Sequence, residues 1–140
     1  MNDLELLKNS IKNKVQIVET EMKRIGYWCT DESVVIESTD IEKSNLSLEK
    51  WIQYIYLNSL KVFIDTLSLD KLLPYRIGLL AFRNYDYMSY VPEAEKLVEM
   101  LNDLESEVID FVTSIDKDKD DPKIKWFIEI KKERDFIKGK

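Results

Sequence analysis

The chain has 140 residues and a net charge of −6, and 44% of its residues are hydrophobic. This length suits one domain around one core, and the composition is that of a folded protein. Since only 3 glycines and 3 prolines interrupt it, we expect long regular elements and an all-α fold.

The residue types that are missing exclude several kinds of chemistry. Histidine is absent and Cys29 is the only cysteine, so histidine-dependent catalysis, an internal disulfide and a zinc or iron–sulfur site held by this chain alone are excluded. We therefore expect no cofactor, and we favour a non-enzymatic protein over an enzyme. The start of the chain lacks the features of a signal peptide and no apolar run could span a bilayer, so we expect a cytoplasmic protein without a membrane partner.

The first predicted helix covers residues 4–25, where apolar residues recur at spacings of three and four. Gly26 supplies its C-terminal stop. From residue 27 to residue 46 the periodicity disappears, which indicates an irregular connection anchored by Trp28. Connections of this length in a small domain are often functional.

Residues 47–67 predict the central helix of a small bundle. Apolar side chains occupy nearly its whole circumference, and such a helix is normally enclosed by others. Ser47 is the expected N-cap, and Trp51 is expected in the core with its indole N–H bonded to an acceptor.

Two polar residues stand out on this apolar helix. Glu49 and Gln53 lie four residues apart, hence on one face. They either fasten the loop that carries Trp28 or line a ligand pocket together with Trp28 and Asp31. Buried polar groups need partners, and both readings supply them.

A proline at position 74 interrupts the pattern, and a short helix is expected at residues 77–85. Tyrosines and arginines gather in this part of the chain. Because both residue types are enriched at binding hot spots, we take four as partner-binding candidates, with packing under the loops as the alternative: Arg76, Arg83, Tyr85 and Tyr87.

The last long predicted helix begins near Pro92, a residue that suits the first turn of a helix. Residues 91–121 carry 11 acids and 3 lysines. A surface of this charge repels nucleic acid and suits a basic protein surface, so Glu95, Glu99 and Asp103 are partner-binding candidates. The alternative is a solvated face that keeps the protein soluble.

Residues 1–115 are predicted to form the helical bundle, with three long helices and one short helix. Residues 116–140 form a charged linker and a basic, aromatic tail. The tail mixes two periods, so helix and strand both remain possible for residues 123–137, with helix slightly favoured.

Three short stretches carry a resemblance to a known family. Trp28 with Asp31, the run Leu-Glu-Lys-Trp-Ile-Gln-Tyr-Ile-Tyr-Leu at 48–57, and Leu73-Pro74 are similar to the YqcC-like proteins. The resemblance covers about residues 4–110, although Asn58-Ser59 stands where the family usually has Pro-Arg. It implies a cytoplasmic all-helical bundle that is often encoded near a tRNA pseudouridine synthase, and hence at most an accessory role.

Two classes of function follow from these observations. The first is a non-enzymatic protein-interaction module, either an immunity or antitoxin-type protein whose acidic helix covers a basic toxin, or an accessory protein of a tRNA-modifying system. The second is a small-ligand-binding protein or enzyme with a pocket between the Trp28 loop and the central helix.

Overall fold

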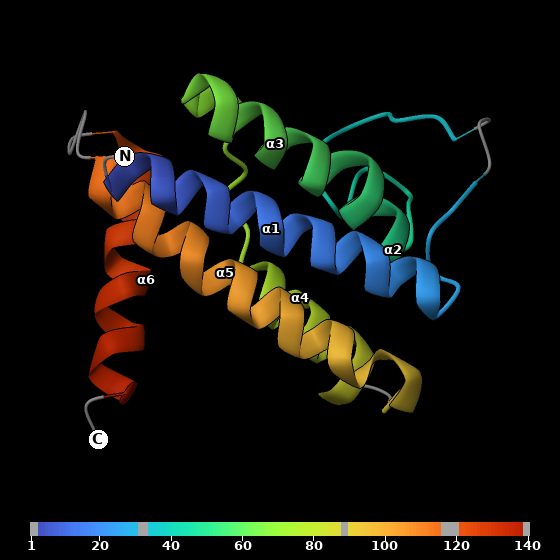
Figure 1. Ribbon diagram of the computed structural model, residues 1–140. Coiled ribbons are helices and arrows are strands. Elements are labelled where there is room, and N and C mark those ends of the chain that lie inside the picture. Colours follow the sequence, from blue (N-terminus) through green and yellow to red (C-terminus); the bar gives the residue numbers. More distant parts are fainter. Residues whose placement is uncertain (1–2, 31–33, 88–89, 116–120, 139–140) are drawn as a thin grey trace.

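The N-terminal helix α1, Asp3–Arg24, has the extent that its periodic pattern predicts. Its face formed by Ile11, Val15, Val18 and Met22 is buried, and it runs along α5 in the computed structural model (Figure 1). The helix stops just before Gly26, the predicted stop, whose φ of 81° is readily adopted only by a residue without a Cβ.

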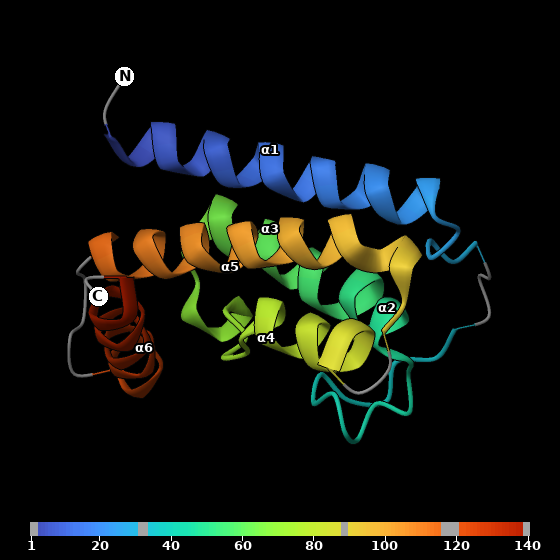
Figure 2. The ribbon, with the colours of Figure 1, turned by 90° about the horizontal axis from the view of Figure 1, so that it is seen from below.

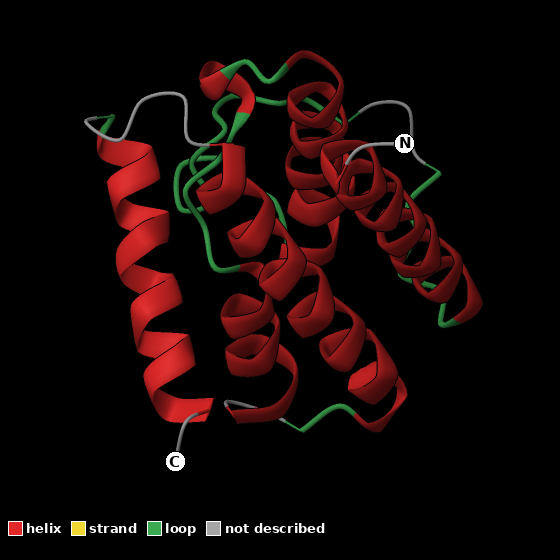
Figure 3. Ribbon diagram, turned by 60° about the vertical axis from the view of Figure 1, so that its left-hand side comes forward, coloured by secondary structure: helices red, strands yellow, loops and turns green. Residues whose placement is uncertain are grey.

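The structure describes residues 3–30, 34–87, 90–115 and 121–138. Asp31 and the linker positions 116–120 therefore lie outside the described residues. Within the described ranges the chain contains helices and loops and no strand (Figure 3), which confirms the predicted all-α class. None of the helices described is long and apolar enough to cross a membrane.

The central helix consists of α2 (Leu48–Trp51), a π-helical turn (Ile52–Tyr56) and α3 (Leu57–Thr66). Trp51 is fully buried and its indole N–H donates to the Thr39 carbonyl oxygen at 3.0 Å, as expected. The helix is less completely enclosed than its pattern suggests, because Val62 is 42% exposed.

The short helix α4 (Ile77–Phe82) continues into a second π-helical turn, Arg83–Tyr87. A 3₁₀ turn at Pro92–Ala94 then leads into α5, Glu95–Ile115. Figure 2 shows α5 between α1 and α4. At the α4–α5 contact Gly78 permits a close approach, since a Cβ there would lie 2.8 Å from the Cα of Asn102.

Residues Pro122–Lys138 form the additional helix α6, which decides between the two alternatives for the tail. Its apolar residues Ile124, Phe127 and Ile130 are buried, and Arg134 bonds Asp110 of α5 at 2.7 Å. The helix packs against α5 and extends away from its C-terminal end (Figure 1). That residues 1–115 fold as a domain without α6 stays a prediction.

Candidate partner-binding site

The start of α5 and the π-helical turn after α4 enclose a cavity of about 230 Å³. Its walls are apolar or aromatic, and carboxylates stand among them. The cavity is lined by Phe82, Tyr85, Asp86, Tyr90, Val91, Glu95, Val98, Glu99 and Asn102. Of the residues that the sequence proposes, Glu95, Glu99 and Tyr85 are thus brought together.

All the charged side chains that line this cavity are acidic. Among the described residues, Asp86, Glu95 and Glu99 line the cavity and no basic residue does. None of the three forms an ion pair with another described residue. Asp103 is exposed and follows Glu99 by four residues, so it extends the same side of α5. We call Asp86, Glu95, Glu99 and Asp103 the acidic face.

The acidic face changes the environment of Tyr90. The Tyr90 hydroxyl donates to the Glu95 carboxylate at 3.3 Å. The negative charge of Glu95, and to a lesser extent that of Asp86, raises the pKa of Tyr90. The cavity mouth is therefore a place of negative potential, where a cation is favoured.

Tyr85 forms a buried wall of the cavity, and contacts with residues outside the cavity hold it in place. Its hydroxyl donates to Glu49 of α2 at 2.8 Å, and its ring lies 5.6 Å from that of Tyr27. Burial, followed by the hydrogen bond to Glu49, raises the pKa of Tyr85 far above its usual value. Glu49, one of the ligand-pocket candidates from the sequence, thus connects the central helix to this wall.

The remaining partner-binding candidates are not among the described residues that line the cavity. Arg76 contacts Glu105 of α5 at 3.5 Å. Arg83 faces a different hollow, beside Leu46 and Leu48. Tyr87 is 75% exposed, with its ring 6.2 Å from that of Phe82.

Gln53 holds the Trp28 loop against the central helix. Its side-chain oxygen accepts from the Cys29 N–H at 2.7 Å, and its amide nitrogen donates to the Cys29 carbonyl oxygen at 2.8 Å. Trp28 itself lies under the Lys23 ammonium, 5.0 Å from the ring centroid. The geometry therefore shows Gln53 fastening the loop, while Asp31, the fourth pocket candidate, is outside the described residues.

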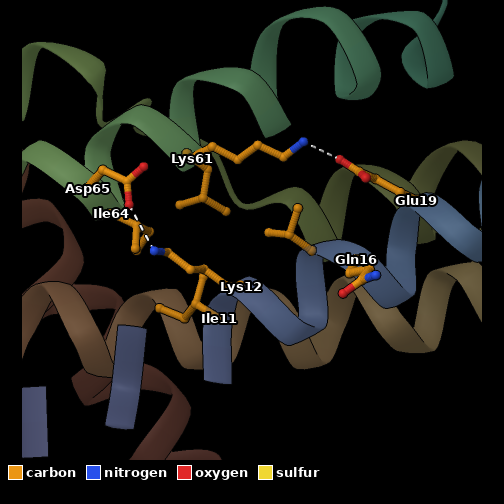
Figure 4. Close-up of a pocket in the computed structure, with 9 residues that line it drawn as sticks. Ile11, Lys12, Gln16, Glu19, Lys61, Ile64 and Asp65 are labelled. Atoms are coloured by element: carbon orange, nitrogen blue, oxygen red, sulfur yellow. Dashed lines mark ion pairs between the residues drawn. The ribbon is translucent and has the colours of Figure 1, made fainter. Parts of the chain in front are cut away.

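A groove between α1 and α3 has no counterpart in the sequence analysis (Figure 4). It has a volume of about 350 Å³ and an aliphatic floor that includes Ile11 and Ile64. Ion pairs close both ends, Lys12 with Asp65 at 2.9 Å and Lys61 with Glu19. In the sequence, the only available signal for this groove was that charged residues of opposite sign lie beside the apolar stripes of the two helices. The sequence does not show that these two helices lie side by side.

Within the described part of the chain, no group of three or more side chains is placed to hold a metal ion. The site can offer carboxylates, tyrosine hydroxyls and ring faces. These groups suit the recognition of a positively charged group.

Comparison with known proteins identifies one family. No curated protein and no solved structure matches the chain. The model of the family DUF446, described as tRNA pseudouridine synthase C, matches residues 10–107. This match contains every residue of the cavity and ends before α6. Since it spans well over half of the sequence, the chain belongs to the DUF446 family.

Proposed function

We propose that this protein is a non-enzymatic interaction module that serves a tRNA pseudouridine synthase as an accessory protein. In this proposal the acidic face binds a basic surface of the enzyme. The observation that carries it is the cavity at the start of α5, whose charged lining residues are all acidic and have no ion-pair partner among the described residues. The family description supplies the link to tRNA modification.

Charge favours an accessory role over direct action on tRNA. The chain carries a net charge of −6, and a surface of that sign repels phosphates, whereas RNA binding depends on lysine and arginine. An enzyme that itself binds tRNA must present basic surfaces. The acidic face complements such a surface, and complementary charge raises association rates and selects partners.

The resemblance to the YqcC-like proteins stays a prediction, and the accessory role it implies agrees with this proposal. A cytoplasmic location, also a prediction, would place the protein with such an enzyme. The immunity or antitoxin form depends on the same acidic face and differs only in the basic partner. A ligand pocket at the Trp28 loop has less support, because Gln53 uses both of its polar atoms on Cys29.

Direct binding measurements test the proposal. The immobilised protein is exposed at low salt to the tRNA pseudouridine synthase encoded in the same genome and, separately, to unmodified tRNA. We expect saturable binding of the enzyme, none of tRNA, and no pseudouridine formation by this protein alone. Binding of tRNA without the enzyme, or no binding of the enzyme, would contradict the proposal, and capture of a cationic toxin instead would favour the immunity form.

A further inference from the structure

We propose that the cavity between α5 and the π-helical turn receives the side chain of one arginine of the partner protein. This inference rests on the proposed function, because it assumes a basic protein partner. It adds the chemical group that the partner inserts and the place where that group is held.

The size of the cavity favours one side chain over a whole small molecule. Its volume is about 230 Å³, whereas pockets for drug-sized ligands typically measure about 300 to 1,000 Å³. Tyr85 and Val98 form buried walls, while the carboxylates of Glu95 and Glu99 belong to exposed residues. A long side chain with an apolar stem and a charged end matches this arrangement of apolar walls and charged mouth.

The aromatic lining favours arginine over lysine. Phe82, Tyr85 and Tyr90 all contribute to the cavity, and a guanidinium stacks on aromatic faces more readily than an ammonium does. Tyr85 is held in place by its bond to Glu49, so this wall is already ordered before binding. Preorganised walls lower the entropic cost of association.

The placement of the carboxylates also suits a guanidinium. Glu95 and Glu99 are one helical turn apart on α5, and Asp86 belongs to the π-helical turn after α4. The five donors of arginine can reach acceptors from more than one direction, whereas lysine offers a compact charge. Like charges one turn apart on a helix destabilise it, and a bound cation would remove that repulsion.

A test with small probes isolates the cavity from the rest of the interface. The amide resonances of the ¹⁵N-labelled protein are followed during titration with N-acetyl-arginine amide and, in parallel, with N-acetyl-citrulline amide, which has nearly the same shape and no charge. We expect the arginine probe to shift the resonances of Tyr90, Glu95, Glu99 and Asn102, with a dissociation constant of about 1 mM, the weak end of specific binding. The citrulline probe should leave them unchanged.

A matched pair of variants distinguishes the effect of a carboxylate inside the cavity from the effect of the protein's net charge on probe binding. Glu99→Gln removes one carboxylate of the cavity, and Glu42→Gln removes one exposed carboxylate elsewhere, so both change the net charge equally. We expect Glu99→Gln to weaken the arginine probe roughly two- to fivefold, as for an exposed ion pair, and Glu42→Gln to leave it unchanged. Circular dichroism checks that both variants fold.

The results distinguish this inference from the proposed function. Equal binding of both probes, equal weakening by both variants, or shifts spread over the whole surface would overturn the arginine site. If the synthase binds and the arginine probe does not, the site is wrong and the accessory role stands. If the probe binds in the cavity and the synthase does not bind, the site stands and the partner is a different basic protein.

Discussion

The side chain of Gln53 forms the hydrogen bonds with the Cys29 backbone that a neighbouring backbone segment would otherwise form. It is buried in the π-helical turn of the central helix and pairs with both polar backbone atoms of Cys29, 24 residues earlier. A loop carrying free backbone groups against an apolar helix would be unfavourable, since a buried donor or acceptor without a partner costs about 1–3 kcal/mol. One glutamine therefore stabilises the packing of the Trp28 loop against the central helix.

We expect Gln53→Ala to lower the free energy of unfolding by about 1–3 kcal/mol, because the N–H and the carbonyl oxygen of Cys29 lose their bonds to Gln53. The carbonyl oxygen keeps the longer bond from the Tyr54 hydroxyl, at 3.3 Å. Urea titration measures this loss. Gln16→Ala, at an exposed position of α1, is the control and should change stability by less than about 0.5 kcal/mol. A variant that stays as stable as the wild type, or a ligand that protects only the wild type, would return Gln53 to the list of binding residues.

The residues show where sequence reasoning succeeds and where it ends. The burial of Trp51 follows from its position on an apolar helix, and the structure confirms it. That Gln53 fastens the Trp28 loop was one of the two readings from the sequence, and its bonds to Cys29 bear it out. The bond that the Tyr85 hydroxyl donates to Glu49 does not follow from the sequence. Helical spacing shows that two polar residues share a face, but it does not say which distant segment lies opposite that face.

At the scale of elements, the contact between α4 and α5 depends on Gly78. This glycine is buried, and the backbone of Asn102 lies where its side chain would be. Such close contact brings Phe82 and Tyr85, on and just after α4, beside the start of α5. The position of the cavity therefore depends on the spacing between these two helices.

We expect Gly78→Ala to destabilise the protein, because inserting a methyl group into a packed core usually costs about 1–3 kcal/mol. The new Cβ would lie 2.2 Å from the Asn102 side-chain oxygen and 2.8 Å from its Cα, and the backbone atom cannot move without shifting α5. The gain in helix propensity, about 1 kcal/mol, offsets part of this cost, so the expected net destabilisation is up to about 2 kcal/mol. Thermal unfolding measures the change.

Asn13→Ala serves as the control, because it raises helix propensity at an exposed position of α1. Its melting temperature should stay equal to that of the wild type or rise. If Gly78→Ala behaves in the same way as Asn13→Ala, α4 and α5 are not in the close contact described above.

The helices themselves were largely predictable, while their arrangement was not. Periodicity indicates α1, the central helix, α4 and α5, and their apolar stripes form the core. The tail mixed two periods, and only its packing on α5 shows it to be α6. The cavity forms where α5 meets the turn after α4, and the groove of Figure 4 forms where α1 meets α3. The spacing of residues along the sequence does not show which helices meet, so neither site could be located from it.

At the scale of the whole molecule, charge is distributed unevenly. The acidic residues gather along α5, whereas α6 carries Lys123, Lys125, Lys131, Lys132 and Arg134. Part of this positive charge is used internally, since Lys131 and Arg134 both contact Asp110. Among the described residues that line the cavity at the other end of α5, the acidic face has no such basic neighbour.

The association rate with the tRNA pseudouridine synthase, measured across a range of salt concentrations, tests the central claim most directly. The triple variant Glu95→Lys, Glu99→Lys and Asp103→Lys reverses three of the four charges of the acidic face. Its control, Asp3→Lys, Glu42→Lys and Glu129→Lys, alters the net charge by the same amount at exposed positions elsewhere. We predict that reversing the face slows association about tenfold or more at low salt and flattens its salt dependence, because electrostatic steering is lost. The control should keep most of the wild-type rate, and equal rates for the two triple variants would contradict the account.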